Sequence, residues 1–280
     1  MHLGLFIFAT EYAIRIDELA KAAEDRGFES LWVPEHTHIP TSRRSPWPGG
    51  AELPKEYSHT LDPFVSLMAA AAVTKKLKVG TGICLIIERD TITTAKEAAT
   101  LDLLSDGRFL FGVGAGWNAE EMENHGTEFQ SRFKLEQEQI KAIKQIWTED
   151  EAEFHGQFVN FDPIWCWPKP IQRPHPPILL GGSGRYTLKR VVEFCDGWIP
   201  LGRSMDAVLE EVAELKIQAD RVGRDINTIS LSVFGSKPDR EVLQRYAEAG
   251  FERVILGLPS EGRDTVLPKL DEWAELIANV

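Results

Sequence analysis

Short apolar runs alternate with longer amphipathic stretches along the whole chain. Continuous apolar character, rather than an alternation of apolar and polar positions, is typical of parallel strands that are covered on both faces. Eight such runs predict strands at residues 3–8, 30–33, 79–84, 109–114, 178–181, 197–201, 229–233 and 253–257. Apolar positions three and four apart predict helices at residues 16–26, 63–75, 94–104, 133–147, 186–193, 207–222, 240–249 and 266–277.

Eight strands, each followed by a helix, are the count of a closed (β/α)₈ barrel, the TIM barrel of the α/β class. An open doubly wound sheet usually has fewer strands. Several predicted helices are followed by a glycine, at Gly27, Gly107, Gly223 and Gly250, which suits a helix that ends in a left-handed residue. We therefore expect one barrel domain over residues 1–280.

Two segments interrupt the alternation, after the second and after the fourth predicted strand. Residues 34–60 hold five prolines and the pair Gly49-Gly50. Residues 150–177 are also rich in proline, and they carry the aromatic residues Phe154, Phe158, Phe161, Trp165 and Trp167. Insertions of this length are usually functional or disordered, and the aromatic residues of the second one favour packing.

Charge and cysteine content narrow the classes of protein. The formal net charge of −12 argues against a nucleic-acid-binding protein, which needs a basic surface. Cys84, Cys166 and Cys195 are too widely spaced for a zinc ribbon and odd in number, so we expect a reducing compartment. The apolar run at residues 3–8 is too short to span a bilayer and lacks the flanks of a signal peptide. These features predict a cytoplasmic protein without a membrane segment.

The active site of such a barrel lies at the C-terminal ends of its strands, so the residues there are the first candidates. The fifth predicted strand ends in Gly181-Gly182-Ser183-Gly184-Arg185, directly before a helix. Backbone N–H groups and the helix dipole at such a turn hold an anion, and Ser183 and Arg185 add donors. The turn therefore predicts a phosphate site for a nucleotide-like cofactor, with a plain strand-to-helix turn as the alternative.

The fourth predicted strand ends in Gly114-Ala115-Gly116-Trp117-Asn118-Ala119, which formally matches the dinucleotide pattern G-x-G-x-x-A. That pattern requires a further strand with an acidic residue about 20 positions later, where this chain instead predicts a helix. We therefore reject a Rossmann fold. The glycines are better explained by another group that approaches the backbone, and Trp117 offers an aromatic wall.

Two histidines follow the second predicted strand, in the sequence Glu35-His36-Thr37-His38. The H-x-H spacing can serve a metal, which makes a metal-dependent barrel hydrolase the rival from another chemical class. No histidine follows the fourth to eighth strands in a suitable place, so a third ligand is missing. A proton donor or acceptor that titrates near neutral pH is the better role for His36, with an exposed loop histidine as the alternative.

Several stretches occur in an order that is known from one enzyme family. They are Leu31-Trp32-Val33-Pro34-Glu35-His36, Val79-Gly80-Thr81-Gly82, Thr94-Ala95-Lys96 through Leu101-Asp102, Leu104-Ser105-Asp106-Gly107-Arg108-Phe109, Gly112-Val113-Gly114-Ala115-Gly116-Trp117, Pro168-Lys169-Pro170, Gly181-Gly182 and Cys195-Asp196-Gly197-Trp198. Together they resemble the luciferase-like monooxygenases, the bacterial luciferase superfamily. Within it they are most similar to the branch that depends on the deazaflavin coenzyme F420.

The resemblance implies a homodimeric barrel with insertions over its mouth and a proton-handling histidine at His36. It implies that the cofactor ring lies against a bulge after the third strand, where members often have a cis peptide that does not involve proline; the matching residues are Gly82 and Ile83. The phosphate end is expected at Gly182, Ser183 and Gly184. The remaining residues that the resemblance assigns to the cofactor site are Glu35, Gly114, Gly116, Trp117 and Gly181.

One departure from the family concerns the residue after the glycine run. Some deazaflavin dehydrogenases have a glutamate there as a proton donor, whereas this chain has Trp117, followed by Glu120 and Glu121. A sugar-phosphate dehydrogenase is therefore disfavoured. The leading hypothesis is hydride transfer between F420 and a small, largely apolar substrate. An FMNH₂- and O₂-dependent monooxygenase, or a binding module that has lost its chemistry, are the alternatives.

Overall fold

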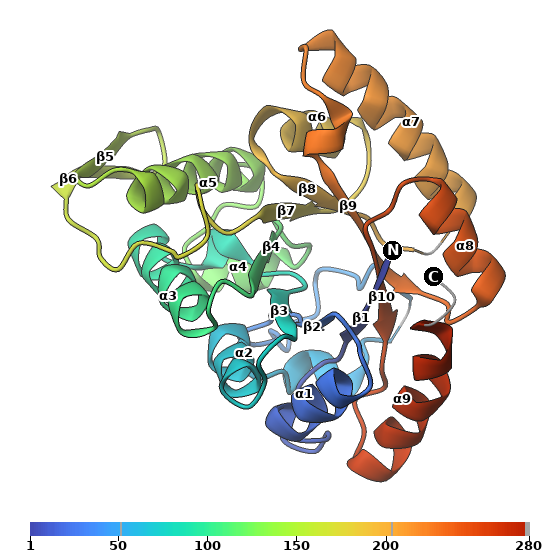
Figure 1. Cartoon of the computed structure of the whole chain (residues 1–280). Coiled ribbons are helices and arrows are strands. Elements are labelled where there is room, and N and C mark those ends of the chain that lie inside the picture. Colours follow the sequence, from blue (N-terminus) through green and yellow to red (C-terminus); the bar gives the residue numbers. More distant parts are fainter. Residues whose placement is uncertain (51, 203, 278–280) are drawn as a thin grey trace.

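The computed structural model describes residues 1–50, 52–202 and 204–277, and it confirms a closed barrel of eight parallel strands (Figure 1). In spatial order the strands are β1 (His2–Phe6), β2 (Ser30–Val33), β3 (Lys78–Thr81), β4 (Phe109–Val113), β7 (Ile178–Gly181), β8 (Gly197–Ile199), β9 (Ser230–Ser236) and β10 (Arg253–Gly257), and β10 pairs with β1. All eight predicted strands are thus present, with ends that differ by a few residues.

Helices follow the strands and surround the barrel (Figure 1). They are α1 (Ile16–Asp25), α2 (Pro63–Ala72), α3 (Thr91–Leu104), α5 (Arg132–Thr148), α6 (Arg185–Phe194), α7 (Met205–Arg221), α8 (Arg240–Glu248) and α9 (Arg263–Ile277). The four glycines predicted to end helices all have positive φ, from 70° at Gly223 to 90° at Gly250. None of the helices in the described part of the chain is long and apolar enough to cross a bilayer.

The sequence did not predict several short elements. These are α4 (Ala119–Asn124), the 3₁₀ helices η1 (Lys55–Ser58), η2 (Ile86–Glu88) and η3 (Ile226–Thr228), and the antiparallel strands β5 (Ala152–His155) and β6 (Asn160–Ile164). Both α4 and η2 lie immediately after barrel strands, at the end where the active site was expected.

The N-terminal end of the barrel is closed by a large side chain and a buried ion pair. The indole of Trp32 fills the interior, and a Cβ atom on Gly80 would lie only 2.4 Å from it. Below it the fully buried Arg253 donates to both carboxylate oxygens of Glu29, at 2.7 and 2.6 Å. Although burial opposes the shift, Arg253 lowers the pKa of Glu29 to about 2. Because the indole and the ion pair fill this end, the ligand site is expected at the opposite, C-terminal end.

The insertion at residues 150–177 does not cover that mouth. Its hairpin β5–β6 lies at the periphery beside α5 (Figure 1), where the backbone N–H groups of Gln157, Phe158 and Val159 donate to the carboxylate of Glu138. The side chains of Trp165 and Trp167 are exposed. The expectation that both insertions cover the mouth is thus wrong for the second one, because the segment follows a helix that has already led the chain back along the outside of the barrel.

Candidate active site

A cavity of about 380 Å³ opens at the C-terminal ends of the strands, within the volume range of small-molecule sites. It is lined by residues of β7, β8, β9, α5 and α6, by the segments that follow β3, β4, β7 and β8, and by the insertion after β2. The lining residues are Pro48, Gly82, Ile83, Gly114, Ala115, Gly116, Trp117, Phe133, Glu136, Gly181, Gly182, Ser183, Thr187, Arg190, Ile199, Leu201 and Phe234. Eight of the ten residues that the sequence assigned to the cofactor site are among them; Glu35 and Gly184 are not.

One wall of the cavity is built from glycines around Ile83. The peptide bond between Gly82 and Ile83 is cis, as the resemblance implied. A Cβ atom on Gly114 would lie 2.1 Å from Cδ1 of Ile83, and one on Gly181 would lie 3.0 Å from its Cγ2. The group that approaches these glycines is therefore the Ile83 side chain. The result is an apolar surface with bare backbone on either side, which fits a flat ring.

The wall continues from Gly181 into the turn before α6. Gly182 and Gly184 have φ of 108° and 91°, which bends the backbone around Ser183. The N–H of Gly184 donates to the carboxylate of Glu211 at 2.6 Å, so this turn already holds one anionic group. Gly184 itself lies just outside the cavity, in an adjoining groove of about 490 Å³ that shares Ser183 with it. The groove contains four basic residues, Lys134, Arg185, Lys189 and Arg190.

His36 lies against the cavity wall, with 8% of its surface exposed, and is not among the lining residues. Its Nδ1 is 2.7 Å from Oε2 of Glu121 on α4, whose Oε1 accepts from the N–H of Thr37 at 3.1 Å. The imidazole contacts Tyr57 and Trp117, with ring centroids 5.2 and 5.9 Å apart. Trp117 lines the cavity, so the histidine and the cavity are separated by one aromatic ring.

Comparison with known proteins assigns this barrel to a family. The model of the luciferase-like monooxygenases matches residues 1–276. The chain belongs to the luciferase-like monooxygenase family. Members are flavin- or deazaflavin-dependent oxidoreductases and monooxygenases, and this chain is an enzyme of that class.

One relative and one protein of similar fold have a cofactor in their names. An uncharacterized protein of Mycobacterium tuberculosis is 40% identical, and the match covers 99% of each chain. The FMNH₂-dependent dimethylsulfone monooxygenase of Pseudomonas putida is 34% identical over 62% of this chain and 48% of its own length. An F420-dependent secondary alcohol dehydrogenase, solved with an F420–acetone adduct, has a TM-score of 0.79 at 21% identity and covers 100% of this chain and 98% of its own. At that identity the structural likeness shows the fold alone.

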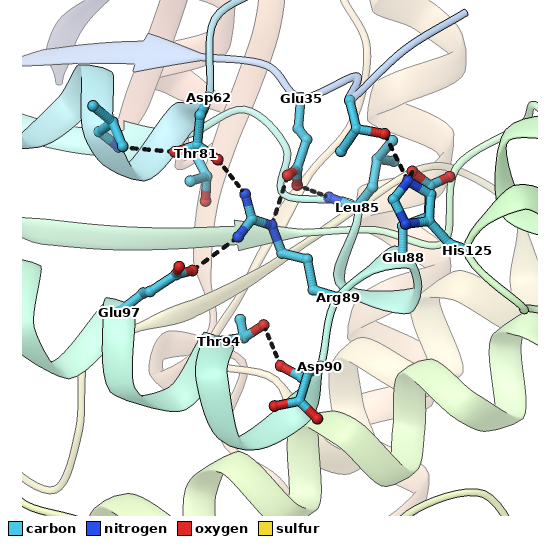
Figure 2. A network of polar contacts seen from close by, with 12 residues as sticks. Glu35, Asp62, Thr81, Leu85, Glu88, Arg89, Asp90, Thr94, Glu97 and His125 are labelled. Atoms are coloured by element: carbon cyan, nitrogen blue, oxygen red, sulfur yellow. Dashed lines mark hydrogen bonds and ion pairs between the residues drawn. The ribbon is translucent and has the colours of Figure 1, made fainter. Parts of the chain in front are cut away.

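Glu35, which the resemblance assigned to the cofactor, lies behind the wall of this luciferase-like site. Its carboxylate accepts from the N–H of Leu85 at 2.7 Å and from Nε of Arg89 at 2.6 Å. Figure 2 shows the carboxylate between these two groups. Arg89 also binds Asp62 and Glu97. Both oxygens of Glu35 bind these partners, so its position indicates a structural role instead of a contact with the cofactor. It anchors the segment after Ile83 and so keeps the bulge in place.

The metal-hydrolase rival finds no support in the geometry of the histidines. His38 Nδ1 is 2.9 Å from the hydroxyl of Thr37, and its Nε2 is 2.8 Å from the amide nitrogen of Asn124. His36 faces Glu121, and Glu35 faces Arg89. Within the described ranges no group of three histidine, cysteine, aspartate or glutamate side chains is placed to hold a metal ion.

The first insertion is fastened over α4. The hydroxyl and the N–H of Ser45 donate to the carboxylate of Glu120, and Arg44 pairs with Glu123. Although burial opposes the shift, the bonds from Ser45 lower the pKa of Glu120 to about 2. Arg43 lies 5.9 Å from the ring centre of Trp117. This insertion thus reaches the cavity, through Pro48, whereas Arg44 is engaged in an exposed ion pair.

The sequence missed a buried ion pair that lines the cavity. Glu136 on α5 is 1% exposed and pairs with Arg190 on α6, while its second oxygen, Oε1, has no hydrogen-bond partner among the described residues. Burial raises the pKa of Glu136 to about 7 although Arg190 opposes the shift. Arg190 also stacks on Phe133 at 4.2 Å. The available signal was positional, since both residues occupy the second turns of two predicted helices of the barrel, α5 and α6.

Proposed function

We propose that this enzyme transfers hydride between coenzyme F420 and a small, largely apolar organic substrate, with His36 exchanging the accompanying proton. The observation that carries the choice of cofactor is the continuity between the glycine-walled cavity and the basic groove along α6. F420 has a phosphate followed by an acidic tail, whereas FMN ends at its phosphate. A groove with four basic residues beyond the phosphate turn suits the longer anion.

The residues of the cavity fit each part of such a cofactor. The deazaflavin supplies hydride chemistry when bound. Ile83 and the flanking glycines offer its ring an apolar surface, and Gly182, Ser183 and Thr187 surround the position expected for the phosphate. The apolar wall excludes water and favours an apolar substrate.

His36 is the residue proposed to handle the proton. Because Nδ1 faces Glu121, Nε2 is the nitrogen left for exchange with the substrate. The ring stands beside Trp117 at the edge of the cavity, so a small adjustment of that indole or of Tyr57 brings Nε2 into the cavity. The protein's contribution is to hold the reacting atoms within attack distance and to supply the proton.

Cofactor titration tests the proposal directly. We expect quenching of intrinsic tryptophan fluorescence by F420 with micromolar affinity, and much weaker binding of FMN. The double variant Lys134→Ala with Lys189→Ala removes two basic groups of the groove that lie outside the cavity, so it should weaken F420 binding and leave FMN binding unchanged. Micromolar binding of FMN without binding of F420 would overturn the proposal and favour the FMNH₂-dependent monooxygenase, which the relative from Pseudomonas putida supports.

The family resemblance also leads us to propose a homodimer. Val65 and Val73 at α2 and Leu104 at the end of α3 are apolar side chains exposed to solvent on neighbouring helices. Exposed apolar side chains that gather on one face mark an interaction surface. Sedimentation measurements that report a monomer at micromolar concentration would contradict the dimer.

A further inference from the structure

A second cavity, of about 410 Å³, is formed where the hairpin β5–β6 meets η2 and the start of α3. It shares no lining residue with the active-site cavity, although α5 contributes to both. The insertion that carries the hairpin does not cover the mouth of the barrel, and it forms a wall of this cavity instead. The lining residues are Ile87, Glu88, Arg89, Asp90, Thr91, Ile92, His125, Thr127, Leu135, Gln139, Phe158, Val159, Asn160 and Phe161.

Two buried side chains of this lining have unused hydrogen-bond acceptors. Glu88 in η2 is 7% exposed, and Gln139 in α5 is 2% exposed. Among the described residues, both carboxyl oxygens of Glu88 and Oε1 of Gln139 have no hydrogen-bond partner. The amide nitrogen of Gln139 donates to the carbonyl oxygen of Arg89 at 3.0 Å, so the amide is held in place and its oxygen is left over. Buried acceptors without donors are costly, and a ligand that brings donors satisfies them.

The basic residues of the lining contribute little free positive charge. The guanidinium of Arg89 forms ion pairs with three carboxylates of other segments, as Figure 2 shows. Burial and the charge of His38 lower the pKa of His125, which favours its neutral imidazole. Asp90 adds a carboxylate to the lining. The cavity therefore has a surplus of acceptors and suits a positively charged ligand.

The hairpin contributes aromatic side chains to the same cavity. Phe158 and Phe161 are two of the aromatic residues that distinguish the second insertion in the sequence. The face of an aromatic ring attracts a cation. Within the described ranges no three acidic, histidine or cysteine side chains are placed to hold a metal ion. An organic cation with N–H donors therefore fits this lining better than a metal ion does.

We propose that the second cavity binds a small organic cation with a primary ammonium group, such as a diamine. The N–H groups of the ligand donate to Glu88 and Gln139, and the hairpin encloses the ligand with Phe158 and Phe161. This binding site is additional to the site proposed for cofactor and substrate, because the two cavities have separate linings.

Calorimetric titration with 1,4-diaminobutane tests the site in the protein without cofactor. We expect saturable binding at one site per chain, with a Kd below about 1 mM. 1,4-Butanediol has the same carbon chain and no charge, so it should bind about 10-fold more weakly or worse. Absence of saturable diamine binding, or equal affinity for the diol, would overturn the proposal.

Glu88→Gln tests where the ammonium group binds. The amide has nearly the shape of the carboxyl group, but it has one acceptor fewer and cannot carry a negative charge, so the affinity for the diamine should fall about 10-fold. The matched control is Glu128→Gln, the same substitution at an exposed position outside the cavity, which should keep the wild-type affinity. Equal affinities of the wild type and Glu88→Gln would overturn the proposal.

Phe158→Leu tests the same site without a change to a buried polar group. The side chain is partly exposed, so the variant should fold like the wild type, and loss of the ring should weaken diamine binding about threefold. Saturating F420 or FMN should not displace the diamine, because the two cavities share no lining residue. An unchanged affinity in Phe158→Leu, or displacement by either cofactor, would overturn the proposal, whichever cofactor the enzyme uses.

Discussion

The two ends of the barrel differ in how fully their buried ionisable side chains are hydrogen-bonded. At the N-terminal end the guanidinium of Arg253 meets both oxygens of Glu29 and the hydroxyl of Ser232, and the pair stays ionised. At the mouth, Glu88 and Glu136 are as deeply buried, yet three of their four oxygens have no hydrogen-bond partner in the described ranges. Burial raises the pKa of both groups.

This difference suggests that the closed end contributes to the stability of the barrel and that the mouth contributes to its function. A buried ion pair in which every guanidinium nitrogen is hydrogen-bonded maintains the shape of the barrel. Buried groups with raised pKa values and unused oxygens are expected where protons or ligands are exchanged. If this comparison is correct, substitutions at the mouth change turnover or binding, and substitutions at the closed end change the free energy of unfolding.

The largest effect is expected at His36. His36→Ala should lower turnover by about 10²–10⁴-fold, because the group that exchanges the proton is removed, while cofactor binding is largely kept. Steady-state kinetics with cofactor titration measure both. The amide of His36→Gln can still donate to Glu121, so this variant should be more stable than His36→Ala. Its turnover should be as low as that of His36→Ala.

His38→Ala is the matched control, because the second histidine of the H-x-H pair faces Asn124 and Thr37 rather than the cavity. It should keep most of the turnover. If His36→Ala kept the turnover of the wild type, His36 would have no part in catalysis. The assignment of function to the mouth of the barrel would then lose its main support.

The closed end should respond in the opposite manner. Arg253→Met leaves the buried Glu29 without its main partner, and breaking a buried pair in this way costs about 3–5 kcal/mol of stability. Denaturant unfolding measures the loss, and the folded fraction should keep its kcat. The effect should shrink as the pH falls from 4.5 toward 2, because Glu29, with its lowered pKa, contributes stability that is lost in that window.

Lys78→Met provides the control for Arg253→Met. Lys78 binds the same carboxylate at 3.0 Å, but its side chain is 39% exposed. Exposed ion pairs contribute less than about 1 kcal/mol, so the loss of stability should be small. A loss equal to that of Arg253→Met would mean that burial does not distinguish the two cations.

The sequence predicted the features that depend on local patterns. Continuous apolar runs revealed the eight strands, and the glycine runs identified the cavity wall at Gly114 and Gly181, because backbone without side chains is needed wherever a group approaches closely. The glycine-rich turn at Ser183, which we propose for the cofactor phosphate, was predicted from the same local pattern. The cis peptide after Gly82 was expected only through the family resemblance.

The side chains that complete the site could not be predicted in this way. Glu121 belongs to a helix of six residues that has too few turns for a recognisable period. Glu136 and Arg190 are 54 positions apart and meet only because α5 and α6 pack side by side. Glu35 was misassigned, because its place beside a candidate histidine says nothing about Arg89, which lies 54 positions further on.

The smallest effect, and the finest test of the comparison, concerns Glu136. Its pKa of about 7 means that the side chain is neutral at pH 6 and negative at pH 8. The group lies beside the position proposed for the cofactor phosphate. Because the two negative charges repel each other, ionisation should weaken the binding of an anionic cofactor by about fivefold, or roughly 1 kcal/mol. Glu136→Gln cannot ionise, so its affinity should be nearly the same at both pH values. Glu193→Gln, at a partly exposed position in the outer groove, should retain the wild-type difference. If Glu136→Gln also bound the cofactor less tightly at pH 8 than at pH 6, the ionisation of Glu136 would not affect cofactor binding. The comparison would then hold only for the closed end of the barrel, where the ion pair of Arg253 and Glu29 maintains stability.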